Sequence, residues 1–312
     1  MNDRKPNETV AMNPADRGDI NRFLANADAV CALMMLPAVT TNDWTSRAAE
    51  AVARLHPGPS RACVMLVAGE VSGTEDGSFR IESVGVCAGE GNGQDSAGSD
   101  EGLTMRVRLE RVRNFGFART PLMMQDGFVG RMSGLSRSWR ETSLGRVWAG
   151  VPAGEVLIGV CPIEGVPGSM VVCMYAGDAH TPECSLQAFG AVMAVLTKQT
   201  AMMYRSMGCT DGVLRWLTAR EQDVLDALVD GLSVREIADR LGRSRHTMHD
   251  HVKNLHKKLN ASCRGELVAA ALGHSECGKR CSLRMPMVIE APSDPIQELK
   301  PSPMVRSNER SE

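Results

Sequence analysis

The sequence predicts an α+β domain, an antiparallel sheet with flanking helices, followed by an all-α module of four short helices. Three observations support this. The chain has 312 residues, about twice the usual length of one domain. Over residues 20–207, stretches with helical spacing of apolar residues enclose several short apolar runs typical of strands. Over residues 213–273, four short helical patterns follow one another, each with its own start signal.

The first domain is predicted to begin with two helices and two strands. Apolar residues recur in steps of three and four over residues 20–37, where Ile20, Phe23, Leu24, Ala27 and Cys31 share one face. The same spacing predicts a helix over residues 43–55, which His56-Pro57-Gly58-Pro59 ends. Apolar runs over residues 62–68 and 79–87 predict strands.

The middle of the domain is less regular. Residues 88–102 are rich in Gly, Ser and acidic residues and predict a loop. From Met105 to Leu109 apolar residues alternate with arginines, which suggests a strand, but the window also fits a helix and is left open. Two further strands are predicted over residues 155–161 and 169–175.

A long helix is predicted from about Thr181 to Met207. Its apolar positions, with one Thr among them, recur in alternating steps of three and four, the spacing of a heptad seam. Such a seam fits a helix that pairs two copies of the chain, and it fits equally a helix packed on its own sheet. The seam consists of Leu186, Phe189, Met193, Leu196, Thr200, Met203 and Met207.

The end of this domain resembles a GAF-type domain, in which paired strands precede a helix introduced by a Thr-Pro-Glu turn, here Thr181-Pro182-Glu183. The resemblance implies a GAF/PAS-like sensory or dimerisation domain over residues 20–207, preceded by a flexible leader over residues 1–19. The effector is not identified by any motif. A domain that only dimerises and senses nothing is the alternative.

Composition gives information on the partner, the state of the cysteines and the location of the protein. The formal net charge of −2, taken as a sum, argues against a nucleic-acid partner. The ten cysteines are scattered, many within apolar runs, which is typical of reduced core thiols. The longest apolar run is too short to span a membrane, and the first 20 residues lack an apolar signal core. We therefore expect a cytoplasmic protein without a membrane segment.

The four short helices of residues 213–273 have recognisable caps. Thr218 with Glu221, and Ser233 with Glu236, have the spacing of capping boxes. Ser244 and Ser262 are expected to cap the third and fourth helices, the last with Leu267, Val268, Ala271 and Leu272 inward. Because the second and third helices are joined by a tight turn at Gly242, the module is predicted to be a helix-turn-helix.

The third helix concentrates positive charge that the net charge conceals. From Arg243 to Lys258 there are five basic side chains against one acidic, with four histidines beside them. Its predicted inner face consists of Met248, Val252, Leu255 and Leu259. The opposite face carries His246, His249, Asp250, Lys253 and Lys257. An α-helix fits the major groove of DNA, where such side chains reach bases and phosphates.

A motif runs through the four helices and consists of Leu217, Thr218, Arg220, Glu221, Val224, Leu225, Gly231, Leu232, Ser233, Glu236, Ile237, Ala238, Leu241, Gly242, Ser244, His246, Thr247, His251, Val252, Lys258, Leu259, Arg264, Glu266 and Leu267. With this motif, residues 217–272 resemble a LuxR/GerE-type helix-turn-helix. The resemblance implies a transcriptional regulator that binds specific double-stranded DNA as a homodimer through its third helix. By motif position, His249, Asp250 and Lys253 are expected to contact bases, and Thr247 and Lys257 to contact or flank phosphates; Lys258 is also expected to contact DNA. The candidate DNA-binding residues are Arg243, Ser244, His246, Thr247, His249, Asp250, Lys253 and Lys257.

Other functions have weaker support. A sigma-factor-like polymerase subunit shares this kind of helix-turn-helix, and RNA polymerase is a further candidate partner of a regulator. We find no catalytic constellation, and so predict no enzyme and no cofactor. His274, Cys277 and Cys281 lack a fourth ligand, so no metal site is predicted. Residues 276–312 are rich in proline and predicted to be disordered.

Overall fold

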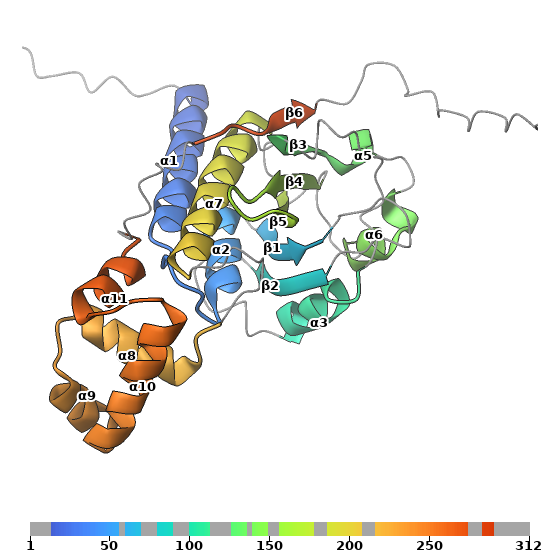
Figure 1. Cartoon of the computed structure of the whole chain (residues 1–312). Coiled ribbons are helices and arrows are strands. Elements are labelled where there is room, and N and C mark those ends of the chain that lie inside the picture. Colours follow the sequence, from blue (N-terminus) through green and yellow to red (C-terminus); the bar gives the residue numbers. More distant parts are fainter. Residues whose placement is uncertain are drawn as a thin grey trace, which may run out of the picture.

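The computed structural model describes residues 14–55, 60–69, 80–89, 100–112, 126–135, 139–148, 156–177, 186–207, 216–273 and 283–289. The first domain is built on one six-stranded sheet in the order β2-β1-β5-β4-β3-β6 (Figure 1). All neighbouring strands are antiparallel except β6, which pairs in parallel with β3. The strands are β1 (Ser60–Ala68), β2 (Arg80–Gly89), β3 (Phe128–Arg131), β4 (Leu157–Pro162), β5 (Ser169–Gly177) and β6 (Met287–Ile289).

Helices cover both faces of this sheet. The larger helical layer consists of α1 (Pro14–Met34), α2 (Trp44–Ala53) and α7 (Leu186–Ser206). The other face packs against short helices: α3 (Asp100–Leu109), α5 (Met132–Leu135), the 3-10 turn η2 (Trp139–Glu141) and α6 (Ser143–Trp148). The predicted α+β class, a sheet with flanking helices followed by a helical module, is confirmed.

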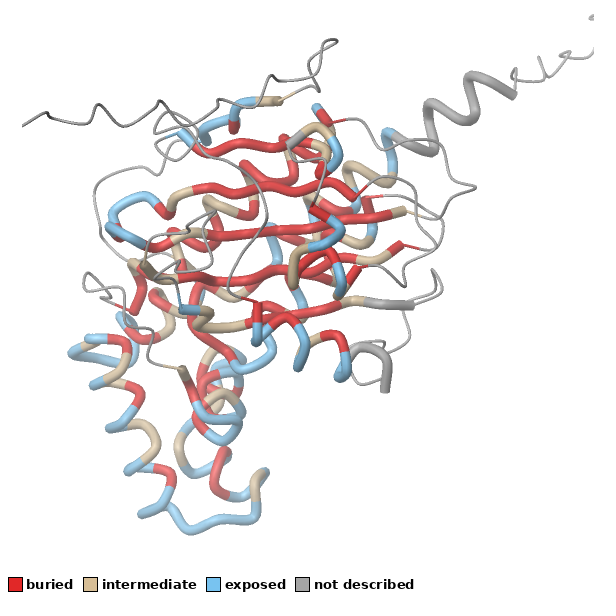
Figure 2. The backbone as a smooth tube through the Cα atoms, turned by 90° about the vertical axis from the view of Figure 1, so that its right-hand side faces the viewer, coloured by how far each residue is buried: buried red, intermediate tan, exposed pale blue. Residues whose placement is uncertain are grey.

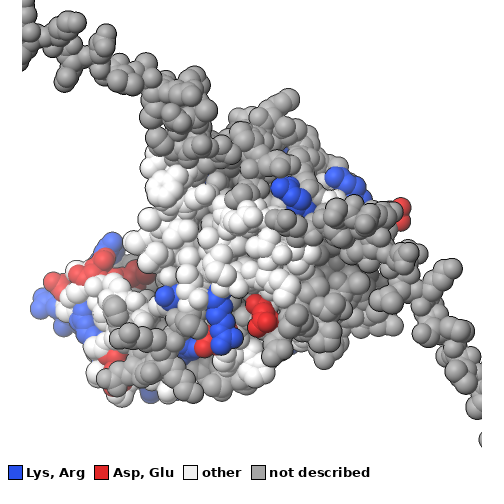
Figure 3. All heavy atoms as spheres, turned by 90° about the horizontal axis from the view of Figure 1, so that it is seen from above, with Lys and Arg blue, Asp and Glu red and all other residues white. Residues whose placement is uncertain are grey.

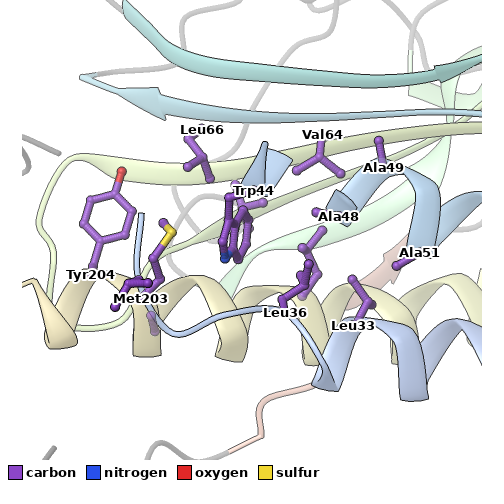
Figure 4. Packing of buried hydrophobic residues seen from close by; sticks show 14 of the residues in the cluster. Leu33, Leu36, Trp44, Ala48, Ala49, Ala51, Val64, Leu66, Met203 and Tyr204 are labelled. Atoms are coloured by element: carbon purple, nitrogen blue, oxygen red, sulfur yellow. The ribbon is translucent and has the colours of Figure 1, made fainter. Parts of the chain in front are cut away.

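Trp44 lies at the centre of the larger layer. Its side chain is buried below the sheet residues Val64 and Leu66 and beside Leu36, which follows α1 (Figure 4). The indole Nε1 donates a hydrogen bond to the Pro37 carbonyl over 2.8 Å. The tryptophan therefore fills the space between sheet and helices and also fixes the chain where α1 ends.

The structure resolves one ambiguity, corrects two boundaries and adds two strands. Residues 105–109 are helical, as part of α3, because Met105 and Leu109 are both buried on one side of that helix. The loop predicted over residues 88–102 ends earlier, since α3 begins at Asp100. The leader is also shorter than predicted, because α1 begins at Pro14. Strand β3 was not predicted, and β6 lies within the segment 276–312 that was predicted to be disordered.

The apolar face on which the α1 prediction rests is not the buried face. Phe23, Leu24 and Cys31 are exposed, whereas Ala29 and Leu33 are completely buried against the rest of the helical layer. Helix α1 thus has two apolar faces, of which its own domain covers one.

The seam of α7 is internal. All seven of its positions, from Leu186 to Met207, are buried. They belong to the core between the sheet and the larger helical layer. Of the two interpretations of the seam, packing on its own domain is therefore the one that the structure shows.

Three buried cysteines support the prediction of reduced core thiols. Cys63, Cys161 and Cys173 lie on neighbouring strands and form no disulfide. Burial raises the pKa of the Cys63 and Cys161 thiols to about 12. Burial also raises the pKa of Cys173, with the two neighbouring thiols contributing. Since the thiolate is the reactive form, these three side chains are packing groups at neutral pH.

The helical module shares a continuous core with the larger helical layer. Leu217, at the entrance to the module, donates its backbone N–H to the carbonyl of Thr40 over 2.9 Å. At the other end of the module, a Cβ built on Gly273 would lie 3.2 Å from the Cβ of Ala38 and 2.7 Å from Met202. Both ends of the module therefore contact the segment between α1 and α2 (Figure 1).

Candidate nucleic-acid interface

The module consists of four helices: α8 (Ala219–Val229), α9 (Val234–Leu241), α10 (Arg245–Lys258) and α11 (Arg264–Ala271). Both predicted capping boxes are present. The Glu221 backbone N–H donates to Thr218 Oγ1 over 3.2 Å, and the Thr218 N–H donates to Glu221 Oε2 over 2.8 Å. Ser233 and Glu236 make the same reciprocal pair at 3.3 and 2.7 Å. These local bonds fix where α8 and α9 begin.

The turn between α9 and α10 has the residues that it requires. Gly242 ends α9 in the left-handed region, at φ 62°, where a side chain would be strained. Two residues later, Ser244 caps α10 by accepting the Thr247 backbone N–H over 3.1 Å. The predicted helix-turn-helix is confirmed, and the start of α10 is held firmly.

The start of α11 differs from the prediction. The residue that precedes the helix is Cys263, and its side chain makes no capping bond. Ser262 instead donates both its backbone N–H and its hydroxyl to Glu266 Oε2, each over 2.6 Å. Leu272 was predicted to point inward but is 54% exposed, because the helix ends before it.

Helix α10 has one buried and one exposed face. Met248, Leu255 and Leu259 are buried and Val252 is half-buried, as predicted, where the helix packs against α8 and α9. In Figure 1 the module, with α9 and α10, lies at the end of the molecule away from the sheet, and Figure 2 shows the lower end of the molecule largely exposed. All eight predicted DNA-binding residues are exposed and lie together on this helix or just before it: Arg243, Ser244, His246, Thr247, His249, Asp250, Lys253 and Lys257.

Asp250 is the one acidic group on this face. Its Oδ2 lies 3.8 Å from Nε2 of His246, one turn earlier on the helix. The other charged groups of the module are mixed in sign, and Figure 3 shows basic and acidic side chains interleaved on it. Positive charge is therefore local to α10 rather than spread over the module.

Lys258 is not part of the exposed face. Its Nζ lies 2.6 Å from Glu221 Oε2 and donates a second hydrogen bond to the Trp216 carbonyl over 2.9 Å. The expectation that Lys258 contacts DNA is therefore wrong. Its side chain ties the end of α10 to the start of α8, 37 residues away in the sequence.

The Glu221 carboxylate is the centre of this arrangement. Burial alone would raise its pKa, but the bonds from Lys258 and Thr218 outweigh the burial and lower it. Glu221 is therefore ionised at neutral pH although it is only 4% exposed. The capping box and the ion pair share this one carboxylate.

Two further tethers were not predicted. Arg264 Nη2 donates to the carbonyls of Leu228 and Leu232 over 3.2 and 2.9 Å, which joins α11 to the end of α8. His256 Nδ1 donates to the Ala261 carbonyl over 2.9 Å, just past the end of α10. The Arg264 bonds hold α11 against the end of α8, and the His256 bond holds the turn that follows α10. A sequence pattern gives no signal for a bond between residues 36 positions apart.

The Ser233 cap provides a local test of this geometry. In Ser233→Ala we expect the amides of α9 to exchange hydrogen about fivefold faster, because losing an N-cap costs about 1 kcal/mol. Mass spectrometry of amide exchange in the full chain would measure this. Ser233→Thr keeps the hydroxyl and should exchange at close to the original rate. Equal rates in all three proteins would show that the capping bond does not limit the opening of α9.

Metal ions and membranes are two further classes of partner besides DNA. Within the described residues, no three His, Cys, Asp or Glu side chains gather as a metal site would require. His274, Cys277 and Cys281 lie outside the described residues. Of the described helices, none is long and apolar enough to cross a membrane.

Comparison with known proteins gives the module a family. Residues 215–271 match the model of bacterial regulatory proteins of the luxR family. The transcriptional regulatory protein MctR of Rhizobium johnstonii is 43% identical over 63 residues, which are 20% of this chain and 29% of that protein. The probable transcriptional regulatory protein SgaR of Hyphomicrobium methylovorum is 48% identical over 56 residues, 18% of this chain and 26% of that protein. The chain thus matches under a third of the length of these relatives.

Solved structures were also compared with the whole chain. Escherichia coli SdiA aligns over 81% of this chain and 98% of its own, with 15% sequence identity and a TM-score of 0.32. SdiA in complex with octanoyl-rac-glycerol aligns over 84% and 97%, with 14% identity and a TM-score of 0.26. The family assignment rests on the module alone: residues 215–271 of this chain are a domain of the LuxR family of bacterial regulatory proteins.

Proposed function

We propose that this protein is a DNA-binding transcriptional regulator in which α10 reads the major groove. The observation that carries the proposal is the exposed face of α10, where polar and basic side chains lie opposite a buried apolar stripe. His249, Asp250 and Lys253 are the proposed base-contacting residues, and Thr247 and Lys257 the proposed phosphate contacts. Arg243, Ser244 and His246 complete the proposed surface.

The charge distribution indicates how such binding would work. The module as a whole is nearly balanced in charge, so its general attraction to the DNA backbone is weak. Affinity would then come from the few basic groups on α10 and from two modules binding together. Two α10 helices in successive major grooves, about one helical turn apart, are the geometry in which helix-turn-helix dimers read half-sites. We therefore propose a homodimer as the active form.

The first domain is proposed to control this dimer. Its GAF-like character, a sensory or dimerising domain, is supported by the order of β4, β5 and α7. The bond from Leu217 to Thr40 and the shared core give a physical connection through which a change in the domain would reach the module. A ligand that binds one arrangement of the domain better than another would shift the population of DNA-competent dimers.

Selection of DNA fragments from a genomic library by the full chain tests the proposal. We expect one enriched motif with two half-sites, bound at least about 1,000-fold more tightly than unrelated DNA. Binding of equal strength to all sequences, or no binding, would contradict a regulator. A thermal-shift screen against metabolites separates a sensing domain from one that only dimerises, since only the former is stabilised by a ligand.

A cytoplasmic location and RNA polymerase as a partner are parts of the same proposal. The proposal assigns no catalytic step to the chain. A sigma-factor-like subunit would instead bind core polymerase tightly without DNA. Copurification with core polymerase but failure to bind any isolated DNA fragment would favour that function.

A further inference from the structure

Helix α1 presents a second apolar face to solvent. On its inner side Ala29 and Leu33 are fully buried. On its outer side Leu24 is 56% and Met34 is 61% exposed, and Cys31 between them is also exposed. An amphipathic surface helix has one apolar stripe, and its other face is polar. The outer face of α1 departs from this rule.

The outer apolar residues have the spacing of a helix-pairing seam. Leu24, Ala27, Cys31 and Met34 follow one another in steps of three, four and three. This is the a/d repeat with which one helix packs along another. The large side chains stand at the ends of the seam, and the small ones, Ala27 and Cys31, stand in the middle, where they let a second helix approach closely.

The outer face is also unusually free of charge. From Phe23 to Met35 the only charged residue is Asp28. Its Oδ1 lies 3.7 Å from Nη1 of Arg54, the residue that follows α2, so its nearest partner belongs to the same chain. In Figure 1, α1 lies at the outer edge of the helical layer, beside α7. A partner of opposite charge would therefore have little to bind on this face.

We propose that the outer face of α1 is the dimer interface, covered by α1 of a second copy of this chain. A two-fold dimer brings the same patch of both subunits together, so the patch must suit itself. A neutral seam of heptad spacing meets this requirement, because it matches a helix of identical spacing and brings no like charges together. The inference rests on the proposed function, which requires two modules, and names the surface that joins them.

The position of α1 connects this interface to DNA reading. The chain leaves α1 at Met34 and reaches Thr40 six residues later, where the carbonyl accepts the Leu217 N–H at the entrance to the module. Pairing two α1 helices would thus set the spacing of the two α10 helices through one short segment. A change in the angle of the α1 pair would alter which half-site spacing the dimer fits.

The solution mass of the full chain tests the proposal. For the unmodified protein we expect a dimer at micromolar concentration in sedimentation equilibrium. Leu24→Glu should raise the dimer dissociation constant about 100-fold or more, because pairing would bury a carboxylate without a partner. The control is Leu103→Glu on α3, also an exposed leucine, which should leave the dissociation constant unchanged. Far-UV circular dichroism checks that both variants are folded.

Cys31 offers a second measurement at the same seam. In the proposed dimer the two Cys31 thiols lie near the two-fold axis, so a short bismaleimide should link them. Cys31→Ser should remove the linked dimer, whereas Cys263→Ser, which removes another exposed thiol, should not.

The outcomes separate the interface from the function. A dimer that persists in Leu24→Glu, with α10 still binding paired half-sites, overturns the α1 interface and leaves the regulator intact. A full chain that is monomeric both in solution and on its DNA site overturns the interface and the dimeric mode of action together. Loss of dimerisation in Leu24→Glu alone supports the interface.

Discussion

Lys258→Met should lower the free energy of unfolding of the helix-turn-helix module by about 2–3 kcal/mol. The change keeps an unbranched side chain of nearly the same length but removes the ammonium that lies 2.6 Å from Glu221. It leaves a buried carboxylate without its cation, and breaking one side of a buried pair commonly costs about 3–5 kcal/mol. We expect a smaller loss because Lys258 is itself 27% exposed. Urea denaturation of the full chain, followed by circular dichroism, would measure it.

The neighbouring lysine provides the control. Lys257 is exposed on the proposed DNA-reading face, so Lys257→Met should change stability by less than about 0.5 kcal/mol while weakening DNA binding. The double variant Glu221→Gln with Lys258→Met removes both charges and should recover part of the lost stability. Equal stability of Lys258→Met and Lys257→Met would mean that the ion pair contributes nothing.

The same pair determines a pH dependence. The folded state lowers the pKa of Glu221 below its ordinary value of 4.5. A lowered folded pKa gives stability that is fully present above the unfolded pKa and is lost as the pH falls through the folded one. The difference between the original protein and Lys258→Met should therefore be constant near pH 7 and shrink below about pH 4.5.

How far the sequence predicts the module depends on the distance between bonded residues. The caps at Thr218, Ser233 and Ser244 involve partners three residues away, so spacing alone identifies them. The tethers of Lys258 and Arg264 involve partners 32 or more residues away. Since nothing in the local pattern separates Lys258 from its exposed neighbour Lys257, only the fold shows which lysine is used internally.

The two long helices illustrate a related limit. Both α1 and α7 have apolar residues in steps of three and four, and this period predicts a helix correctly in each. The period gives no information on what covers the face. In α7 the face packs on its own sheet, whereas in α1 the face used for the prediction is exposed, and Ala29 and Leu33 pack inside. An apolar helix face that packs on its own domain and one that packs on a partner have the same spacing of apolar residues in the sequence.

Two short strands at one side of the sheet, and the short helices α5 and α6, are elements that the local sequence pattern did not predict. Strand β3 has four residues, and β6 has three within a proline-rich stretch. Strand β6 is stabilised by pairing with β3. In addition, the Met287 N–H donates to the Gly127 carbonyl over 3.0 Å. Pairing between residues some 160 positions apart cannot be seen in local propensity. The sheet therefore ends with a segment that composition alone assigns to a disordered tail.

Lys253→Ala and Lys257→Ala should weaken DNA binding in different ways. Lys253 lies on the exposed face of α10 beside His249 and Asp250, where it would reach a base edge. Its loss should cost about 1–3 kcal/mol on the best site, and relax the base preference at one position. Lys257, one turn later, would contact a phosphate. Its loss should weaken binding about equally on all sequences and reduce the salt slope by about one.

Titrations on the selected site and on single-base variants, each at several salt concentrations, separate these effects. For Lys253→Ala the affinities for the four bases at one position should converge while the other positions keep their preferences. For Lys257→Ala the ranking of sites should stay the same and the plot of log affinity against log salt should become less steep, because one fewer counterion is released on binding. Identical behaviour of the two variants would overturn the assignment of Lys253 to a base. In that case α10 would hold the DNA backbone through both lysines, and specificity would have to come from the histidines and from Asp250 at its exposed face.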